Sequence, residues 1–540
     1  MRRMIVLIYC LFAAANYLYA QEEMFVKAIA DFLSCDIEEV MEEDYERLSE
    51  YMRRPLKVNM ASMSALLRSG LFTRFQAASI IDYRSRSGQI LSLMELSSLD
   101  GFGEDSAEKI HPFISLEYVS DFSGRNENEI TARISSRTTE GIERLGYASR
   151  YKMNWGDALN VSIAMSRSLT SSTLIPDAVC GSVEGRFRRI PLRVVAGDYN
   201  ARFGQGLALW SGVSFNSLNS PSSFMKRASG ITASTSFTGS STLRGLAAEY
   251  LKKNLSITAG VTSSFTPLLN MTWLMSQGQV GITFGNNIST DASLCLGGVD
   301  LFAEFAYDKL AAIHSFLAGT IFPAGDLWNF AAMIKACADG YSFTASGSRQ
   351  RAQLANGTFA ADFILYPTSK TDTQETSIQI KFHSQWQFTL SETLSLTIRG
   401  TERLRNWGLR SRTDLRTDLL WNYGRLNLSF RMNALKCRNA SFLSYIEEGI
   451  KTNTFSLYFK QGVFVVDHWD DRIYAYERDA PGCYNSPAFY GRGVWTSLMA
   501  SIKSGKLIKL YFRAGYTTYP FMKENKPGKA ELRFQSVFDF

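Results

Sequence analysis

The stretch SIQIKFHSQWQFT, Ser377–Thr389, alternates apolar and polar side chains over thirteen residues. One face of this stretch holds Ile378, Ile380, Phe382, Trp386 and Phe388, with Leu390 beyond it and Ser384 as the polar exception, and the other holds Ser377, Gln379, Lys381, His383, Gln385, Gln387 and Thr389. Because successive side chains of a strand point to opposite faces, the pattern predicts a β-strand with one apolar side. It is longer than the strands of a soluble sandwich, which average about five or six residues.

The same alternation recurs from about Glu129 to Phe540. It separates Ile130, Ala132 and Ile134 from Thr131, Arg133, Ser135 and Arg137, and Ile508, Leu510, Phe512 and Ala514 from Lys509, Tyr511 and Arg513. Arg and Lys recur on the polar face, as expected for the wall of a wet lumen. Short turns such as GNNIST alternate with longer irregular segments such as Tyr476–Gly493. We therefore predict an antiparallel transmembrane β-barrel over residues 126–540, with an even number of roughly 16 to 22 strands.

The last ten residues, ELRFQSVFDF, continue this pattern to the end of the chain. Leu532, Phe534, Phe538 and Phe540 share one face of the predicted strand. The segment is similar to the terminal-strand signal of outer-membrane proteins, which implies the barrel assembly machinery and outer-membrane lipid as partners. Aromatic residues make up 13% of the chain, a content that suits the girdles at the two membrane interfaces.

The N-terminus indicates export. Arg2 and Arg3 precede an apolar run from Met4 to Ala15, and Ala20 precedes Gln21, so we expect a signal peptide at residues 1–20. Six cysteines remain after cleavage, scattered singly without a CxxC pair, and the sequence leaves their pairing open. With four histidines in the whole chain we expect no metal site and no cofactor.

Residues 21–54 predict an acidic amphipathic helix, or two helices with a break near Cys35. Its apolar stripe consists of Phe25, Ile29, Phe32, Leu33, Ile37, Val40 and Met41. Residues 21–120 carry a formal net charge of −8, whereas residues 121–540 carry +13. We interpret the acidic side as a solvated face. A nucleic-acid domain usually shows the opposite, basic, balance.

Residues 55–118 predict two helix-turn-helix units. The first turns at Gly70, and the second turns at Gly101 and Gly103 before Pro112 ends it. Each glycine allows a tight backbone turn before the next helix begins. The front of the mature chain is therefore expected to be a small all-α domain.

These units resemble the tandem helix-hairpin-helix domain of the competence DNA receptor ComEA. The resemblance covers residues 55–115 and rests on Val58-Asn59, Ala61-Ser62, Ile80-Ile81, Tyr83-Arg84, Gly88, Gly101-Phe102-Gly103, Lys109-Ile110 and Pro112-Phe113-Ile114. It implies contacts with DNA through Gly70, Arg74, Gly101, Phe102, Gly103 and Lys109. In that family the turn aims backbone amides at a phosphate.

Two positions depart from the family pattern. Phe72 replaces the second glycine of the first hairpin, and Asp105, beside Glu104, stands where a lysine is usual. The carboxylates cap the helix but repel phosphate, so the hairpins could instead pack helices or dock a protein. Both readings stay open at this point.

Two further motifs have functional and structural interpretations. Gly204-Gln205-Gly206 lacks the third glycine of a nucleotide fingerprint, and we interpret it as a bend or a close backbone approach. His468, near Asp467, Asp470 and Asp471, could form an acid/base pair, but no nucleophile elbow supports one. We interpret Asp467–Gly493 as a strand end followed by a structured or inward-folded loop, and we expect no catalytic residue and no enzyme.

The whole mature chain is similar to Gram-negative outer-membrane proteins that join helix-hairpin-helix repeats to a barrel. The expected architecture is an α+β multidomain chain, with a small all-α helix-hairpin-helix domain in the periplasm and a large barrel in the outer membrane. The leading functional hypothesis is DNA binding that assists uptake or transport. The alternative is a non-enzymatic structural or assembly protein whose helical domain docks another envelope protein.

Overall fold

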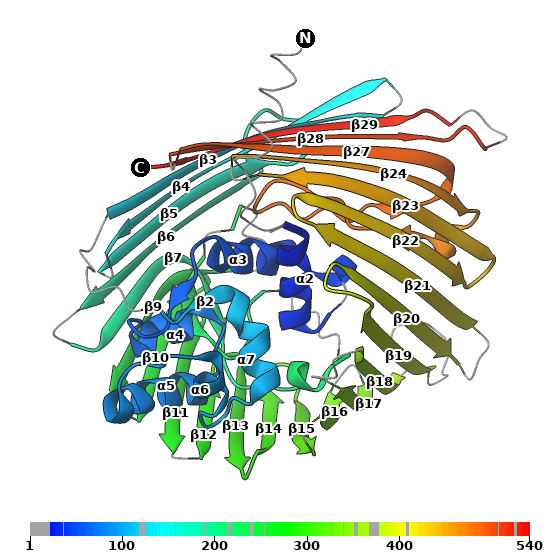
Figure 1. Cartoon of the computed structure of the whole chain (residues 1–540). Coiled ribbons are helices and arrows are strands. Elements are labelled where there is room, and N and C mark those ends of the chain that lie inside the picture. The colour runs from blue at the N-terminus through cyan, green and yellow to red at the C-terminus, as the bar shows by residue number, and fades with distance from the viewer. Residues whose placement is uncertain are drawn as a thin grey trace.

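Antiparallel β-strands form most of the chain from Asn126 onward in the computed structural model of the protein (Figure 1). The structure describes residues 22–540 except 36, 118–125, 140, 157, 188–189, 213–217, 235, 238–241, 253, 276, 326, 338–339, 350–354, 367–376, 407–409, 453, 506 and 523–525. The expected signal peptide, with Cys10, lies outside the described residues.

Within the described residues, 24 strands form a closed antiparallel ring. They are β3 (Asn126–Thr139), β4 (Ile142–Trp155), β5 (Leu159–Arg167), β6 (Ala178–Phe187), β7 (Leu192–Arg202), β9 (Leu243–Lys252), β10 (Leu255–Thr262), β11 (Pro267–Met275), β12 (Gly278–Phe284), β13 (Asn287–Leu296), β14 (Val299–Asp308), β15 (Ile313–Ala324), β16 (Trp328–Cys337), β17 (Gly340–Arg349), β18 (Ala355–Tyr366), β19 (Ser377–Thr389), β20 (Leu394–Arg405), β21 (Arg410–Tyr423), β22 (Leu426–Lys436), β23 (Ala440–Lys451), β24 (Phe455–Val466), β27 (Gly491–Ser504), β28 (Ile508–Thr518) and β29 (Lys529–Asp539).

The ring closes where β29 pairs with β3, from Asp539 opposite Glu129 to Lys529 opposite Thr139. A short strand, β8 (Gly230–Ala233), pairs with the end of β7 but adds no member to the ring, because β7 also pairs directly with β9. The predicted fold class is confirmed, but the predicted number of 16 to 22 strands is wrong. The predicted number is too low because some neighbouring strands are joined by two-residue turns, such as Gly297–Gly298 and Gly424–Arg425. Turns this short leave no visible break in the alternating sequence pattern.

Side chains sort by face as the alternation predicts. On β21, Leu415 is 54% exposed on the outside, whereas the neighbouring Arg416 is buried inside. On β19, Phe382 is half-exposed and the adjacent His383 is buried. Large exposed apolar side chains recur around the ring, while buried polar and charged ones recur on the inner wall. An apolar exterior of this kind matches the hydrocarbon core of a bilayer.

The two rims of the barrel differ. One rim carries connections of two to five residues, together with the start of β3 and the C-terminal Phe540, and we call it the short-turn rim. The other rim, the loop rim, carries longer segments, among them the described parts of 203–229 and the segment 467–490. This asymmetry matches the predicted pattern of short turns at one end and longer loops at the other.

A helical domain precedes the barrel. Its elements are α2 (Glu22–Leu33), η1 (Ile37–Glu39), α3 (Glu42–Arg53), β1 (Leu56–Lys57), α4 (Met63–Ser69), α5 (Arg74–Ser87), α6 (Leu93–Ser97), α7 (Glu104–Ile110), η2 (His111–Phe113) and β2 (Ile114–Ser115). The acidic segment is thus two helices with a break around Cys35. Ser62, Thr73 and Ser92 cap the helices that follow them, and Thr73 and Gln76 form a capping box. None of the described helices is both long and apolar enough to span a bilayer.

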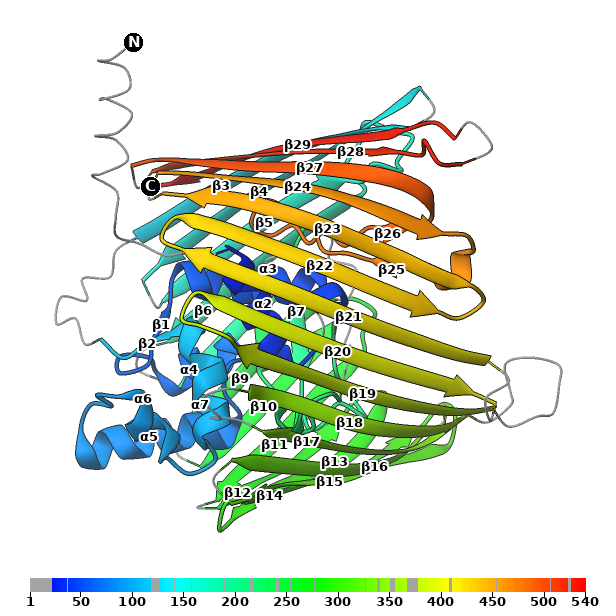
Figure 2. The ribbon, with the colours of Figure 1, turned by 45° about the vertical axis from the view of Figure 1, so that its right-hand side comes forward.

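The helical domain lies inside the barrel. Its core includes Phe32, Leu48, Leu66, Phe72 and Phe113, each at most 2% exposed. The helices α2 and α3 fill the centre of the ring in Figure 1, and in Figure 2 α5 and α6 lie at the end that also bears the C-terminus. From the sequence we expect this domain to lie in the periplasm, separate from the barrel, whereas in the structure its helices pack against the inner wall.

Candidate functional site at the contact between helical domain and lumen

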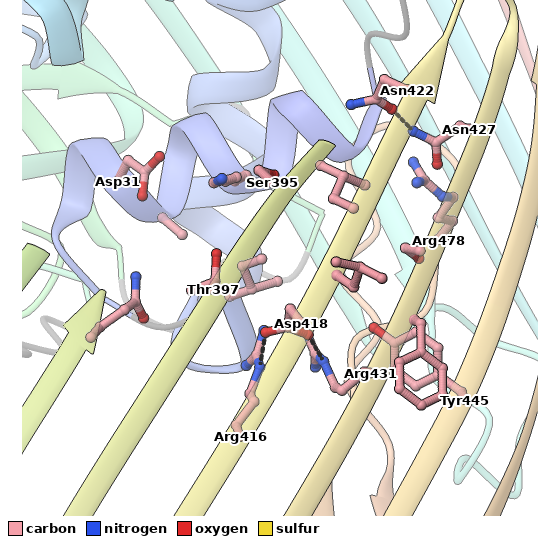
Figure 3. A pocket seen from close by; sticks show the side chains of 18 of the residues that line it. Asp31, Ser395, Thr397, Arg416, Asp418, Asn422, Asn427, Arg431, Tyr445 and Arg478 are labelled. Carbon is pink, nitrogen blue, oxygen red and sulfur yellow. Dashed lines mark hydrogen bonds and ion pairs between the residues drawn. The ribbon is translucent and has the colours of Figure 1, made fainter. Parts of the chain in front are cut away.

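The acidic face of the helical domain contacts basic residues of the inner barrel wall. Glu38, on η1, accepts a hydrogen bond from Nη1 of Arg416 on β21 at 2.7 Å and also pairs with Arg431 on β22. Asp418 joins the same two arginines on the wall side, 2.5 Å from Nε of each. Figure 3 shows Asp418 between Arg416 and Arg431 in the pocket beside α2. Two carboxylates therefore neutralise two buried guanidinium groups.

The charges around Glu38 fix its protonation state. Burial would raise the pKa of this carboxyl, but the charges of Arg416, Arg431 and Arg399 outweigh that effect and hold the pKa well below its ordinary value. Glu38 is therefore ionised in the docked domain. A group with a lowered pKa stabilises docking above its ordinary pKa and loses that effect only as the pH falls through the lowered value.

Helix α3 repeats the arrangement on the other side of the lumen. Glu46 pairs with Arg150 on β4, and both side chains are buried. Glu50 lies 2.6 Å from Nζ of Lys152 on the same strand. The interpretation of the acidic side as a solvated face is therefore wrong, because a barrel wall of opposite charge covers it. Sequence reasoning missed these contacts, although the opposite net charges of residues 21–120 and 121–540 carry their signal.

The two basic residues predicted to bind DNA have partners inside the barrel. Arg74, 2% exposed at the start of α5, lies 3.2 Å from Glu249 on β9. Lys109, on α7, donates to Ser220 at 3.1 Å and to Ser222 at 2.5 Å. Arg74 is thus buried against the wall, and Lys109 is partly buried against Ser220 and Ser222.

The other predicted DNA contacts shape the hairpin turns. Gly70, Gly101 and Gly103 all have positive φ values, of 64°, 80° and 95°. The carbonyl of Gly101 accepts a hydrogen bond from Gln76, and Phe102 packs against Phe72 with ring centroids 6.0 Å apart. Four helices separated by glycine turns thus occupy the range of the predicted hairpins. Membership of the ComEA-like family stays a prediction.

A loop folded in from the loop rim meets the helical domain. This inward loop, residues 467–490, contains η4 (Trp469–Asp471), β25 (Ile473–Tyr474) and β26 (Ala488–Phe489). Its Tyr484 hydroxyl donates to the carbonyl of Ile37, and its Tyr476 belongs to the core of the helical domain. Glu477 pairs with Arg513 on β28, which fixes the loop to the wall. The predicted inward-folded segment is confirmed.

A second segment, 203–229, reaches the helical domain from the same rim. The carboxylate of Glu304 on β14 accepts hydrogen bonds from the amides of Gln205, Leu207 and Ala208, at 2.7, 3.1 and 3.3 Å. Gly204 has a φ of +58°, and a Cβ there would lie 3.0 Å from that carboxyl group. The glycine therefore permits the close backbone approach that the sequence predicts.

The residues near His468 have structural roles. Asp467 pairs with Arg492 at 2.7 Å. Asp471 is fully buried and accepts hydrogen bonds from the amides of Cys437, Arg438 and Asn439. These carboxylates anchor the inward loop at the loop rim.

No family model matches the chain, and no curated protein matches it. Among solved structures, the P pilus usher (PapC) translocation pore matches 77% of this chain and 99% of its own at 9% identity, with a TM-score of 0.40. The siderophore receptors PirA from Pseudomonas aeruginosa and from Acinetobacter baumannii have identities of 10% and 8% and TM-scores of 0.42 and 0.44. They cover 77% of this chain and 80% and 81% of their own. Function therefore has to follow from the geometry of this chain.

The contact of Glu38 with the wall predicts a measurable loss of docking. Glu38→Ala removes one of the two carboxylates that pair with Arg416 and Arg431. Breaking a buried ion pair costs about 3–5 kcal/mol. We expect faster hydrogen exchange in residues 22–53 of the variant. Asp82→Ala, which removes an exposed pair with Arg86, is the control and should leave exchange unchanged. Equal exchange in the two variants would contradict the assignment.

Proposed function

We propose that this chain is an outer-membrane transport barrel whose lumen is closed by its own N-terminal helical domain. The observation that carries this proposal is the set of ion pairs that holds the acidic helices against the inner wall. Closed barrels satisfy every backbone hydrogen bond within the ring, and the apolar exterior suits lipid. Solute passes only when the helical domain shifts or leaves.

The size of the ring supports the same function. Barrels of about 16–18 strands leave an aqueous channel, and those of about 22 strands hold a plug in the lumen. Without the helical domain, a 24-strand ring would enclose a wide open lumen. The helical domain enters from the short-turn rim, while the inward loop 467–490 and the segment 203–229 meet it from the loop rim.

The orientation follows from the rims. Outer-membrane barrels place short turns in the periplasm and longer loops outside the cell. The short-turn rim carries the start of β3, next to the helical domain, so we place this end of the domain in the periplasm. The barrel assembly machinery is the partner that insertion would require. Such a transporter needs no catalytic residue, and we propose that the protein is not an enzyme.

Conductance in a planar bilayer tests the proposal. The wild-type protein should show low conductance, because the helical domain occupies the lumen. The triple variant Glu38→Ala, Glu46→Ala and Glu50→Ala should show frequent large openings, since four ion pairs with the wall are lost. Arg86→Ala, at an exposed position, should behave like the wild type. A wild-type protein that conducts as a constantly open pore would rule the proposal out.

A narrower proposal is that the helical domain binds DNA and assists its uptake. The four helices and their glycine turns support it, because amides at such turns can bind phosphate. The contacts of Arg74 with Glu249 and of Lys109 with Ser222 mean that DNA would bind through these residues only after the domain leaves the wall.

Titration with duplex DNA at two salt concentrations tests this narrower proposal. The triple variant should bind more tightly than the wild type, with salt-sensitive affinity, because Arg74 and Lys109 are released. Adding Arg74→Gln and Lys109→Gln should remove that gain. If neither protein shows salt-sensitive binding, the DNA proposal fails while the transport proposal stands.

The alternative partner is another envelope protein that docks on the end of the helical domain. Leu91, just before α6, and Met94, on α6, are 75% and 77% exposed. Large exposed apolar side chains favour protein contact over DNA contact. A recurrent protein crosslink to this end in intact cells, without nucleic acid, would favour this partner.

A further inference from the structure

A cavity of about 860 Å³ lies in the lumen between the helical domain and the loop rim. Residues Glu38–Met41 of the helical domain, strands β19–β21 and the inward loop 467–490 contribute to its wall. Sites for small molecules typically enclose about 300–1,000 Å³. The cavity is thus large enough for a small organic solute that enters from the loop rim.

The described lining of the cavity is cationic. It includes seven Arg or Lys side chains and four carboxylates. Among these carboxylates, Glu531 pairs with Arg137, Arg513 and Lys529, Asp414 pairs with Arg399, and Glu38 pairs with Arg416 and Arg431. These pairs leave positive charge concentrated on β19, β20 and β21.

Three of the cations form a row across neighbouring strands. Lys381 on β19 stands directly opposite Arg403 on β20, and Arg403 stands directly opposite Arg412 on β21. Side chains directly opposite on adjacent antiparallel strands have Cβ atoms about 4.5–5.5 Å apart, and like charges there are destabilising. A bound anion would relieve the repulsion within this row.

Asp362 and Asp414 lie near the row and interact with it through their charge, but no described carboxylate forms an ion pair with its three cations. Lys381 donates to the amide oxygen of Asn219 at 3.2 Å, and Arg412 donates to backbone carbonyls of the inward loop. The Nε of Arg403 is buried without a hydrogen-bond partner among the described residues. Asp362, opposite Lys381 on β18, accepts a hydrogen bond from Thr344 and forms no ion pair within the described residues.

We propose that the row Lys381–Arg403–Arg412 is a binding site for a small phosphate-bearing solute. A phosphate group presents several strong acceptor oxygens and up to two negative charges, and arginine forks bind it with paired hydrogen bonds. A single carboxylate has fewer acceptor oxygens than are needed to accept hydrogen bonds from three adjacent cations. The site binds its ligand whether or not the barrel transports. The statement that this ligand is the transported substrate rests on the function proposed above.

The position of the site links binding to the helical domain. Glu38 lines the same cavity, and the charge of Arg399 contributes to its lowered pKa. A dianion in the cavity would attract the guanidinium group of Arg399 and repel the carboxylate of Glu38. Ligand would therefore weaken docking of the helical domain from the loop-rim side.

Calorimetric titration of the full-length protein in detergent micelles tests the site. The probes are sodium pyrophosphate and glucose 6-phosphate, with citrate as the carboxylate comparison and a short oligonucleotide as the polymeric phosphate. We expect both small phosphates to bind more tightly than citrate and the oligonucleotide. Citrate binding as tightly as pyrophosphate would overturn the phosphate assignment, and binding of the oligonucleotide alone would overturn the small solute.

The variants separate a binding role from a structural one. Arg403→Gln should weaken binding of pyrophosphate about tenfold, which is the loss of one charge-assisted hydrogen bond. Without ligand, the same variant should resist thermal unfolding at least as well as the wild type, because one like-charge repulsion is gone. Arg86→Gln, at the opposite rim, should change neither quantity. Unchanged affinity in Arg403→Gln, or lowered stability without a change in affinity, would refute the site.

These outcomes are independent of transport. Binding without any conductance change in the triple variant would keep the site and reject the transport function. Regulated conductance without binding of phosphate would keep the transport function and reject the site.

Discussion

Buried charge on the inner wall of the barrel has to be neutralised, and the helical domain does this. Arg150, Lys152, Arg416 and Arg431 point into the ring, where the packed helices remove them from water. A buried ion left without a partner costs several kcal/mol, and an open lumen would keep these groups hydrated. The acidic residues of η1 and α3 therefore contribute to the barrel wall as well as to their own domain.

The same constraint orders the lumen along its axis. Near the short-turn rim and the centre, carboxylates of the helical domain face wall cations in close pairs. Near the loop rim lies a cavity whose described lining has more cations than carboxylates. The inward loop 467–490 connects the two zones, because Tyr484 contacts the helical domain while Glu477 pairs with Arg513. Closure by the helical domain and binding of the ligand thus take place in adjacent zones of one charged lumen.

Local patterns in the sequence predicted the barrel well and its contents poorly. The alternation in Ser377–Thr389 reports which face of a strand is apolar, because that is a property of neighbouring residues. The strand number was underestimated where glycine turns leave no break in the pattern. Hairpins between residues 62 and 110 were also visible, since glycine turns and helix caps are local features.

Long-range contacts were not visible in the same way. Glu38 was assigned to a solvated face because helical periodicity reports the existence of a polar side but not its partner. Arg74 was assigned to a phosphate, yet it lies against Glu249, 175 positions away in the chain. The one signal of long-range contact was the opposite net charge of residues 21–120 and residues 121–540. It predicts attraction between them without identifying the pairs.

Reciprocal charge reversal at Glu50 and Lys152 tests most directly that these ion pairs hold the helical domain in the lumen. The readout is protection of the domain from added protease in the full-length protein. Glu50→Lys alone and Lys152→Glu alone should each expose the domain, and the two together should restore protection, as expected for a direct pair. Equal protection in all three variants, or equal cleavage in all three, would contradict the account.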